Sequence, residues 1–299
     1  MEDYKQELLL LISTPLYAIL IGLEMVLSAV HHKHLYTVKD TLTNVYLTSL
    51  NFSLELLIRV FCLGFLAYFF QFHVLDIQNQ YLYWFLLLIL QDIAFYFEHR
   101  VDHYCRFFWA VHVTHHSSEK FNLTTGFRSS VFQPLYRFVY FIPLAVIGFK
   151  PLDIMLMYSA TQIYGILIHT QYIKKLGFLE YFMATPSHHR VHHASNTIFL
   201  DKNMGMVLII WDKIFGTFAS EDDLKDEQIR FGLTKNIERP NHPVDIVFHE
   251  WRNILDDFKM NIPFTTKLKY LFMPPGWSHD GSRKTSKQLR AELKKKREQ

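Results

Sequence analysis

The sequence predicts an all-α integral membrane protein, a helical bundle of about four transmembrane helices that carries a histidine-rich helical cap. Half of the 299 residues are hydrophobic and 16% are aromatic, yet the mean hydropathy is only slightly positive. This combination is typical of a membrane protein with a substantial polar part. The chain also contains several long apolar runs, and eight of its 17 histidines lie in three short clusters just beyond such runs.

The apolar runs define the membrane helices. Residues 8–30 and 45–70 are each long enough to cross a bilayer, which requires about 20 residues. A third run, 81–97, becomes polar toward its end and leads directly into the first histidine cluster. Residues 136–169 form two apolar runs interrupted by proline and glycine, and they predict a membrane hairpin, either a short re-entrant pair or two full spans.

We interpret residues 1–299 as a single domain in which membrane and cap segments alternate. A net charge of only +3 argues against a nucleic-acid partner, while the clustered Lys and Arg near the C-terminal end favour the cytoplasmic side of a membrane. A multi-pass protein of this kind fits a bacterial inner membrane or an endoplasmic reticulum. The segments are 8–97 with the first three membrane helices, 98–135 as a cap segment with the first two histidine clusters, 136–169 as the membrane hairpin, 177–277 as a cap segment with the third cluster, and 278–299 as a solvated basic tail.

The three clusters have the spacings H-x-x-x-H, H-x-x-H-H and H-x-x-H-H. Residues three and four apart share one face of a helix, so each cluster is expected to direct all of its imidazoles at one point. A structural zinc site closes at four ligands, and eight donors therefore predict two metal ions. Iron is the expected metal, because zinc has no redox chemistry and imidazole binds iron readily. The cluster residues are His99, His103, His112, His115, His116, His189, His192 and His193.

Three further side chains are candidates for the same site. His169 ends the hairpin at the border between apolar and polar chain, so it is either a ninth ligand or an interfacial side chain. Asp92 lies two helical turns before His99 and could orient a ligand imidazole, or it is simply a buried polar group. Glu119 follows His116 by three residues and could accept a hydrogen bond from an imidazole or bind a polar head of a substrate; a surface charge is the alternative.

A metal pair held by histidine at a membrane surface suits oxygen activation beside a lipid chain. The sequence offers no reductant site of its own, so the electrons are expected from a small cofactor or a redox partner. The alternative from another class is a histidine-rich metal transporter or metal-binding membrane protein. Transporters place ionisable residues at mid-membrane, whereas these clusters lie beyond the apolar runs, which favours an enzyme.

The stretches around the clusters resemble a known family. They read WAVHVTHHSSE at 109–119, TPSHHRVHH at 185–193, DKN at 201–203 and VLIIWDKIFGTF at 207–218. Over roughly residues 91–218 the chain resembles the fatty acid hydroxylase/sterol desaturase superfamily of membrane di-iron enzymes, and it is most similar to the alkylglycerol monooxygenase branch.

The resemblance implies that the eight clustered histidines bind two iron ions in a cytoplasmic cap, with His169 as an extra ligand. For the alkylglycerol branch it implies O₂-dependent hydroxylation of the ether-bearing carbon of an alkylglycerol, with tetrahydrobiopterin as the electron donor. Other branches hydroxylate or desaturate sterols and fatty acyl chains with a cytochrome- or ferredoxin-type partner, and these reactions are the alternative. One departure weakens the expected cofactor: the chain reads His169-Thr170-Gln171 where that branch has His-Thr-Glu.

Overall fold

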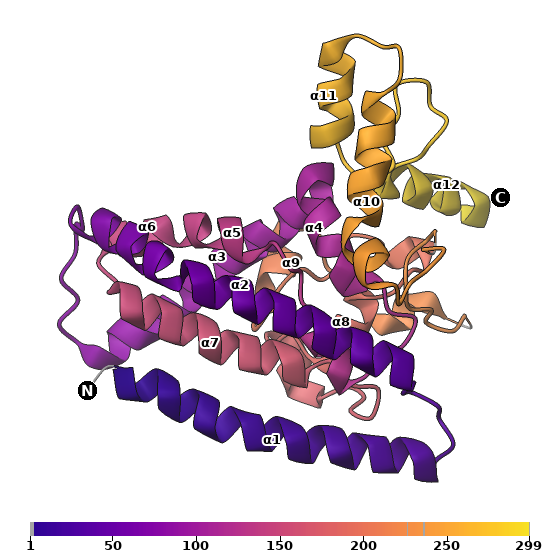
Figure 1. Ribbon diagram of the computed structural model, residues 1–299. Helices are drawn as coiled ribbons and strands as arrows, with labels where there is room; N and C mark the ends of the chain where they lie inside the picture. The colour runs from indigo at the N-terminus through magenta and orange to yellow at the C-terminus, as the bar shows by residue number, and fades with distance from the viewer. Residues whose placement is uncertain (1–2, 226, 236, 299) are drawn as a thin grey trace.

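The computed structural model describes residues 3–225, 227–235 and 237–298, and these residues are helical apart from loops and two isolated β-bridges (Figure 1). The all-α class is therefore confirmed. The α-helices are α1 Asp3–Val30, α2 Val38–Phe70, α3 Gln80–Tyr104, α4 Arg106–His116, α5 Pro134–Arg137, α6 Ile142–Ile147, α7 Pro151–Leu167, α8 Pro186–His192, α9 Ile210–Phe215, α10 Pro243–Phe258, α11 Phe264–Phe272 and α12 Ser286–Glu298. The 3₁₀ helices are η1 Leu123–Phe127, η2 Phe138–Phe141, η3 Gly177–Tyr181, η4 Thr197–Phe199 and η5 Glu221–Leu224.

Among the described residues, α1, α2 and α3 are long and apolar enough to cross a membrane. Asn79 caps α3 by accepting a hydrogen bond from the Leu82 N–H at 3.0 Å. Thr37 caps α2 in the same way. Helix α2 begins seven residues before the predicted span, and its first two turns belong to the cap, where Asp40 and Asn44 contact the guanidinium of the fully buried Arg128.

The predicted hairpin is present as a broken first arm, α5–η2–α6, and a continuous second arm, α7. Helix α7 has 17 residues and is about 25 Å long, which is shorter than a hydrocarbon core of about 30 Å. The arms are joined at Gly148, whose φ of +132° is in a region that L side chains rarely adopt. A Cβ at this position would also overlap a backbone oxygen of Leu75, so this turn requires glycine.

The largest apolar core lies at the end of the bundle remote from the cap. It joins α2, α3, α6 and α7 and leaves the opposite ends of α3 and α7 free for polar side chains (Figure 1). Burial of this apolar surface stabilises the bundle by about 25 cal/mol per Å². Its fully buried members include Leu66, Leu87, Leu144, Phe149 and Ile154.

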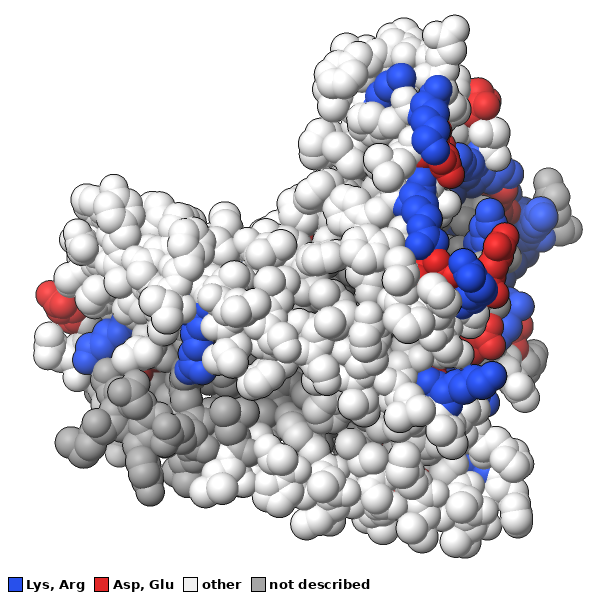
Figure 2. Space-filling model, viewed as in Figure 1, with Lys and Arg blue, Asp and Glu red and all other residues white. Residues whose placement is uncertain are grey.

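The cap contains the polar part of the chain. Lys, Arg, Asp and Glu side chains gather on one side of the molecule, over α10–α12, whereas most of the rest of the visible face lacks charge (Figure 2). The predicted basic tail forms the helix α12, which packs against η4 although none of its described residues is buried. Arg283 pairs with the buried Asp257, and Arg290 donates to the Leu200 carbonyl oxygen, which fixes the tail to the cap.

Candidate metal centre

The predicted histidines converge from four segments of the chain. Helix α3 ends in His99 and His103, and the single extended residue Cys105 turns the chain back into α4. Helix α8 starts at Pro186, which is favoured in a first helical turn. His169 follows the last turn of α7. All nine imidazoles lie in two groups, and within each group the candidate ligand nitrogens are no more than 4.8 Å apart; one group is His99, His103, His112, His116 and His192, and the other is His115, His169, His189 and His193.

The prediction that each cluster points at one place is wrong for two of the three clusters. In α4, His112 and His116 belong to the first group and His115 to the second. In α8 the division is reversed, since His189 and His193 belong to the second group and His192 to the first. The reason is helical geometry: with 3.6 residues per turn, positions i and i+4 differ by about 40°, but i+3 and i+4 differ by about 100°. Each H-x-x-H-H motif therefore contributes imidazoles to both groups.

Within each group the Nε2 atoms face one another. The His99 and His112 Nε2 atoms are 3.1 Å apart, and those of His169 and His189 are 2.9 Å apart. Four imidazoles donate from Nδ1 to backbone carbonyl oxygens, which leaves the inward Nε2 as a lone-pair donor. Lone pairs at this separation repel unless a cation or a proton lies between them. The four Nδ1 bonds are His99 to Met204 at 2.8 Å, His115 to Arg128 at 3.0 Å, His169 to Gly165 at 2.7 Å and His192 to Lys202 at 3.0 Å.

The electrostatics of the groups also match metal ligation. Burial, reinforced by the neighbouring imidazoles, lowers the pKa of five histidines of the second and third clusters well below 6.5, and it lowers the pKa of His115 to about 4; the five are His112, His116, His189, His192 and His193. These rings are neutral at pH 7, which is the form that binds metals. The Nε2 atoms of His103 and His192 are buried and have no hydrogen-bond partner within the described residues. A metal ion would satisfy both.

Two aspartates outside the predicted set of site residues stand behind the first group. The fully buried Asp102 has one carboxylate oxygen 3.6 Å from His112 Nδ1, and its two oxygens also accept hydrogen bonds from Gln133 and Tyr136. Asp201 lies 3.5 Å from His103 Nδ1. Asp102 occupies position i+3 from His99, and this spacing could have indicated it.

The two predicted acidic residues lie elsewhere. Asp92 does not orient an imidazole: its carboxylate accepts hydrogen bonds from the Val207 and Leu208 N–H groups and from Trp211 Nε1, at 2.9 to 3.0 Å. It fixes the turn before α9 to α3. Glu119 is exposed and lies beyond α4, which ends at His116, so it does not share a helical face with that residue.

A cavity of about 650 Å³ opens beside both groups. Histidines of each group form one wall, and polar side chains of α2, α5 and α7 form much of the remainder. Gly165 lies where the cavity approaches α7, and a Cβ there would overlap the Met206 sulfur. A small molecule can therefore reach both groups from a single chamber, which we call the histidine chamber; its polar lining includes Asn51, Ser129, Ser130, Gln133, Arg137 and Gln162.

Comparison with known proteins shows what this arrangement is similar to. Residues 84–217, which contain all nine histidines, match the model of the fatty acid hydroxylase family. The chain is 40% identical to human alkylglycerol monooxygenase over 195 residues, which cover 65% of this chain and 42% of the human protein.

More distant relatives have names that refer to other lipids. The ornithine lipid hydroxylase of Rhizobium tropici is 31% identical over 133 residues, covering 44% of this chain and 40% of that protein. A Delta(7)-sterol 5(6)-desaturase of Gibberella zeae is 26% identical over 168 residues, covering 54% and 50%. The chain spans less than half the length of the alkylglycerol monooxygenases that it matches. No solved structure matches the chain.

Proposed function

We propose that this protein is a di-iron, O₂-dependent membrane monooxygenase that hydroxylates a C–H bond of a lipid, with the ether-bearing carbon of an alkylglycerol as the reacting position. The observation that carries the proposal is the pair of buried imidazole groups on one chamber. The similarity to proteins named as alkylglycerol monooxygenase supports the choice of substrate.

The residues fit iron. Nine imidazoles in two adjacent groups exceed the four ligands of a closed zinc site, and imidazole is a ligand that iron accepts. Two iron ions, when bound, supply the redox chemistry that O₂ reduction and C–H oxidation require. His99, His103, His112, His116 and His192 would hold one ion, and His115, His169, His189 and His193 would hold the other.

The contribution of the chain is to orient these ligands and to exclude water. Backbone carbonyl oxygens fix four imidazoles by their Nδ1 atoms, and carboxylates stand behind two others. The aromatic ring of Phe121 stacks on His169, with ring centroids 5.5 Å apart, and it is almost fully buried. Such a shell keeps water from the ligands on the side away from the chamber.

The electrons would come from outside the chain, from tetrahydrobiopterin or from a cytochrome- or ferredoxin-type partner. Gln171, which replaces the glutamate of the alkylglycerol branch, donates from its amide to the Phe121 carbonyl oxygen at 2.7 Å. A carboxylate could not donate this bond. Gln171 therefore holds the backbone of Phe121 in place, so its amide has a structural role here. For this reason tetrahydrobiopterin remains the first electron donor to test.

We also propose that the cap faces the cytoplasm of a bacterial inner membrane or of an endoplasmic reticulum. The charged surface is concentrated over α10–α12 at the cap end (Figure 2). Lys and Arg beside membrane helices are typical of the cytoplasmic face.

The test uses the full chain in lipid nanodiscs. We expect two irons per chain by mass spectrometry of the metal, and conversion of an alkylglycerol to a fatty aldehyde that requires O₂ and tetrahydrobiopterin. His112→Ala should lose both iron and activity, while His73→Gln, outside the two groups, should keep both. Parallel arms with fatty acyl lipids, sterols and a reduced ferredoxin identify a different branch. Iron flux into vesicles without oxygen uptake would instead support a transporter and end the proposal.

A further inference from the structure

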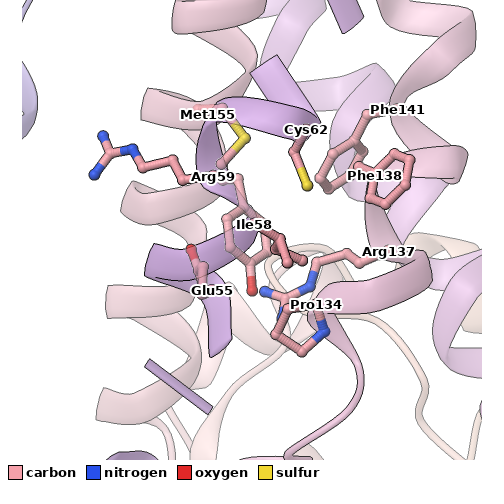
Figure 3. Close-up of a pocket in the computed structure, with 10 residues that line it drawn as sticks. Glu55, Ile58, Arg59, Cys62, Pro134, Arg137, Phe138, Phe141 and Met155 are labelled. Atoms are coloured by element: carbon pink, nitrogen blue, oxygen red, sulfur yellow. The ribbon is translucent and has the colours of Figure 1, made fainter. Parts of the chain in front are cut away.

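A second cavity of about 350 Å³ lies among α2, α5, η2 and α7 (Figure 3). Apolar side chains form most of its lining, which also includes the charged Glu55, Arg59 and Arg137; the apolar members include Ile58, Cys62, Phe138, Phe141 and Met155. In Figure 3 the Cys62 thiol points into this space. We call it the apolar cavity.

The apolar cavity and the histidine chamber meet at two residues, Arg137 and Tyr158, which line both. The Arg137 guanidinium lies over the Tyr158 ring, 4.5 Å from its centroid. This contact is a cation–π pair between α5 and α7. A molecule that occupied both spaces would pass beside it.

The two spaces differ in chemistry. The chamber carries polar groups beside the imidazoles, and two of its donors are buried without a hydrogen-bond partner in the described part of the chain: Gln162 Nε2 and Arg137 Nε. Buried donors without partners destabilise the folded protein, and a ligand that brings acceptor oxygens would satisfy them. The apolar cavity offers mainly hydrocarbon contacts, with the charged side chains of Glu55, Arg59 and Arg137 at its edge.

We propose that the two cavities form one binding site for a single-chain amphiphile, with the alkyl chain in the apolar cavity and an oxygen-bearing polar end in the histidine chamber. The inference rests on the proposed function, which it deepens. It places the carbons next to the polar end beside the imidazoles, so these carbons rather than the middle of the chain are the ones oxidised. Gln162 and Arg137 hold the polar end and determine specificity for it.

Cys62 provides a measurement that needs neither metal nor turnover. In a Cys105→Ser chain in nanodiscs, the rate of Cys62 alkylation by N-ethylmaleimide is followed by mass spectrometry. Hexadecylglycerol at saturation should slow it at least tenfold, and hexadecane, which lacks a polar end, should slow it much less. In a Cys62→Ser, Cys105→Ser, Leu57→Cys control, where the thiol lies on an exposed face of α2, hexadecylglycerol should change the rate less than twofold.

Two variants extend the test to affinity. Met155→Trp fills the apolar cavity and should weaken binding of radiolabelled hexadecylglycerol at least tenfold, whereas Leu57→Trp on the exposed face should leave it within twofold. Gln162→Leu should reduce protection by hexadecylglycerol to the level given by hexadecane. Equal protection by the two compounds in the parent chain, or unchanged binding in Met155→Trp, would overturn the proposal.

The outcomes separate the two proposals. Protection of Cys62 without any lipid oxidation would leave the amphiphile site standing and remove the monooxygenase. Oxidation of alkylglycerol without protection would do the reverse, because the substrate would then reach the imidazoles by another route.

Discussion

Replacement of Asp102 by asparagine isolates the role of a carboxylate behind a candidate ligand. Asp102 is fully buried, and its oxygens face Gln133 Nε2 at 2.9 Å, the Tyr136 hydroxyl at 2.7 Å and His112 Nδ1 at 3.6 Å. Asparagine keeps the shape but replaces one acceptor oxygen with a donor, which opposes the donors that face it. We therefore expect the His112 ring to lose part of its orientation.

The size of the effect follows from the distances. Loss of a group that orients a metal ligand costs about 10–100-fold in metal affinity. The 3.6 Å separation exceeds a normal hydrogen bond, and Ser130 Oγ also lies 3.3 Å from His112 Nδ1. We therefore expect a loss of iron affinity at the lower end of this range, about tenfold, which corresponds to about 1.4 kcal/mol at 25 °C. Competition with a chelator of known iron affinity measures it.

Glu98→Gln is the matched control. Glu98 lies one turn earlier in α3, is equally buried, and neither carboxylate oxygen has a hydrogen-bond partner among the described residues. The iron affinity of the Glu98→Gln variant should stay within twofold of that of the parent protein. If Asp102→Asn binds iron as tightly as the parent, or if both variants weaken it equally, the carboxylate does not act through His112 and our reasoning is wrong.

Other variants test the fold and the two groups. His115→Ala removes a nitrogen from the second group only, so we expect iron per chain to fall by at least one, as counted by metal mass spectrometry; unchanged iron would contradict the assignment. Gly148→Ala should destabilise the protein by about 1–3 kcal/mol, because Gly148 has a positive φ. Gly22 lies inside α1 with open space around it, so Gly22→Ala should stabilise the protein by about 0.5–1 kcal/mol. Thermal unfolding in detergent compares the two variants. Arg290→Met removes the contact between the tail and Asp201, whose carboxylate lies 3.6 Å from the guanidinium. This variant should weaken iron binding severalfold in the chelator assay and leave the melting temperature nearly unchanged. Equal iron binding would show that the tail does not influence the centre.

The histidine spacing predicted which side chains meet but not how they divide. Periodicity identifies a helical face to within about 100°, and that is the angle between neighbouring residues such as His115 and His116. The division depends on where α3, α7 and α8 lie around α4, which is a property of the packing. His169 illustrates the same limit, since only the position of α7 brings it to the second group.

The acidic residues were harder to predict because a carboxylate in an apolar helix has several possible partners. Asp92 and Asp102 are both buried in α3, ten residues apart, and only the course of the loop at 204–209 assigns backbone N–H groups to the first. Glu119 was misassigned for a simpler reason. The helix ends at His116, and the face argument no longer holds beyond it.

The reciprocal division of histidines between α4 and α8 has a consequence for assembly. An ion bound as we propose in either group would restrain the rotation of both helices, and these same helices present nitrogens to the other group. The first ion would thus preorganise the second pocket, and half-filled molecules should be rare during iron titration. A gradual, two-step uptake curve would indicate instead that the helices are already rigid before any metal arrives.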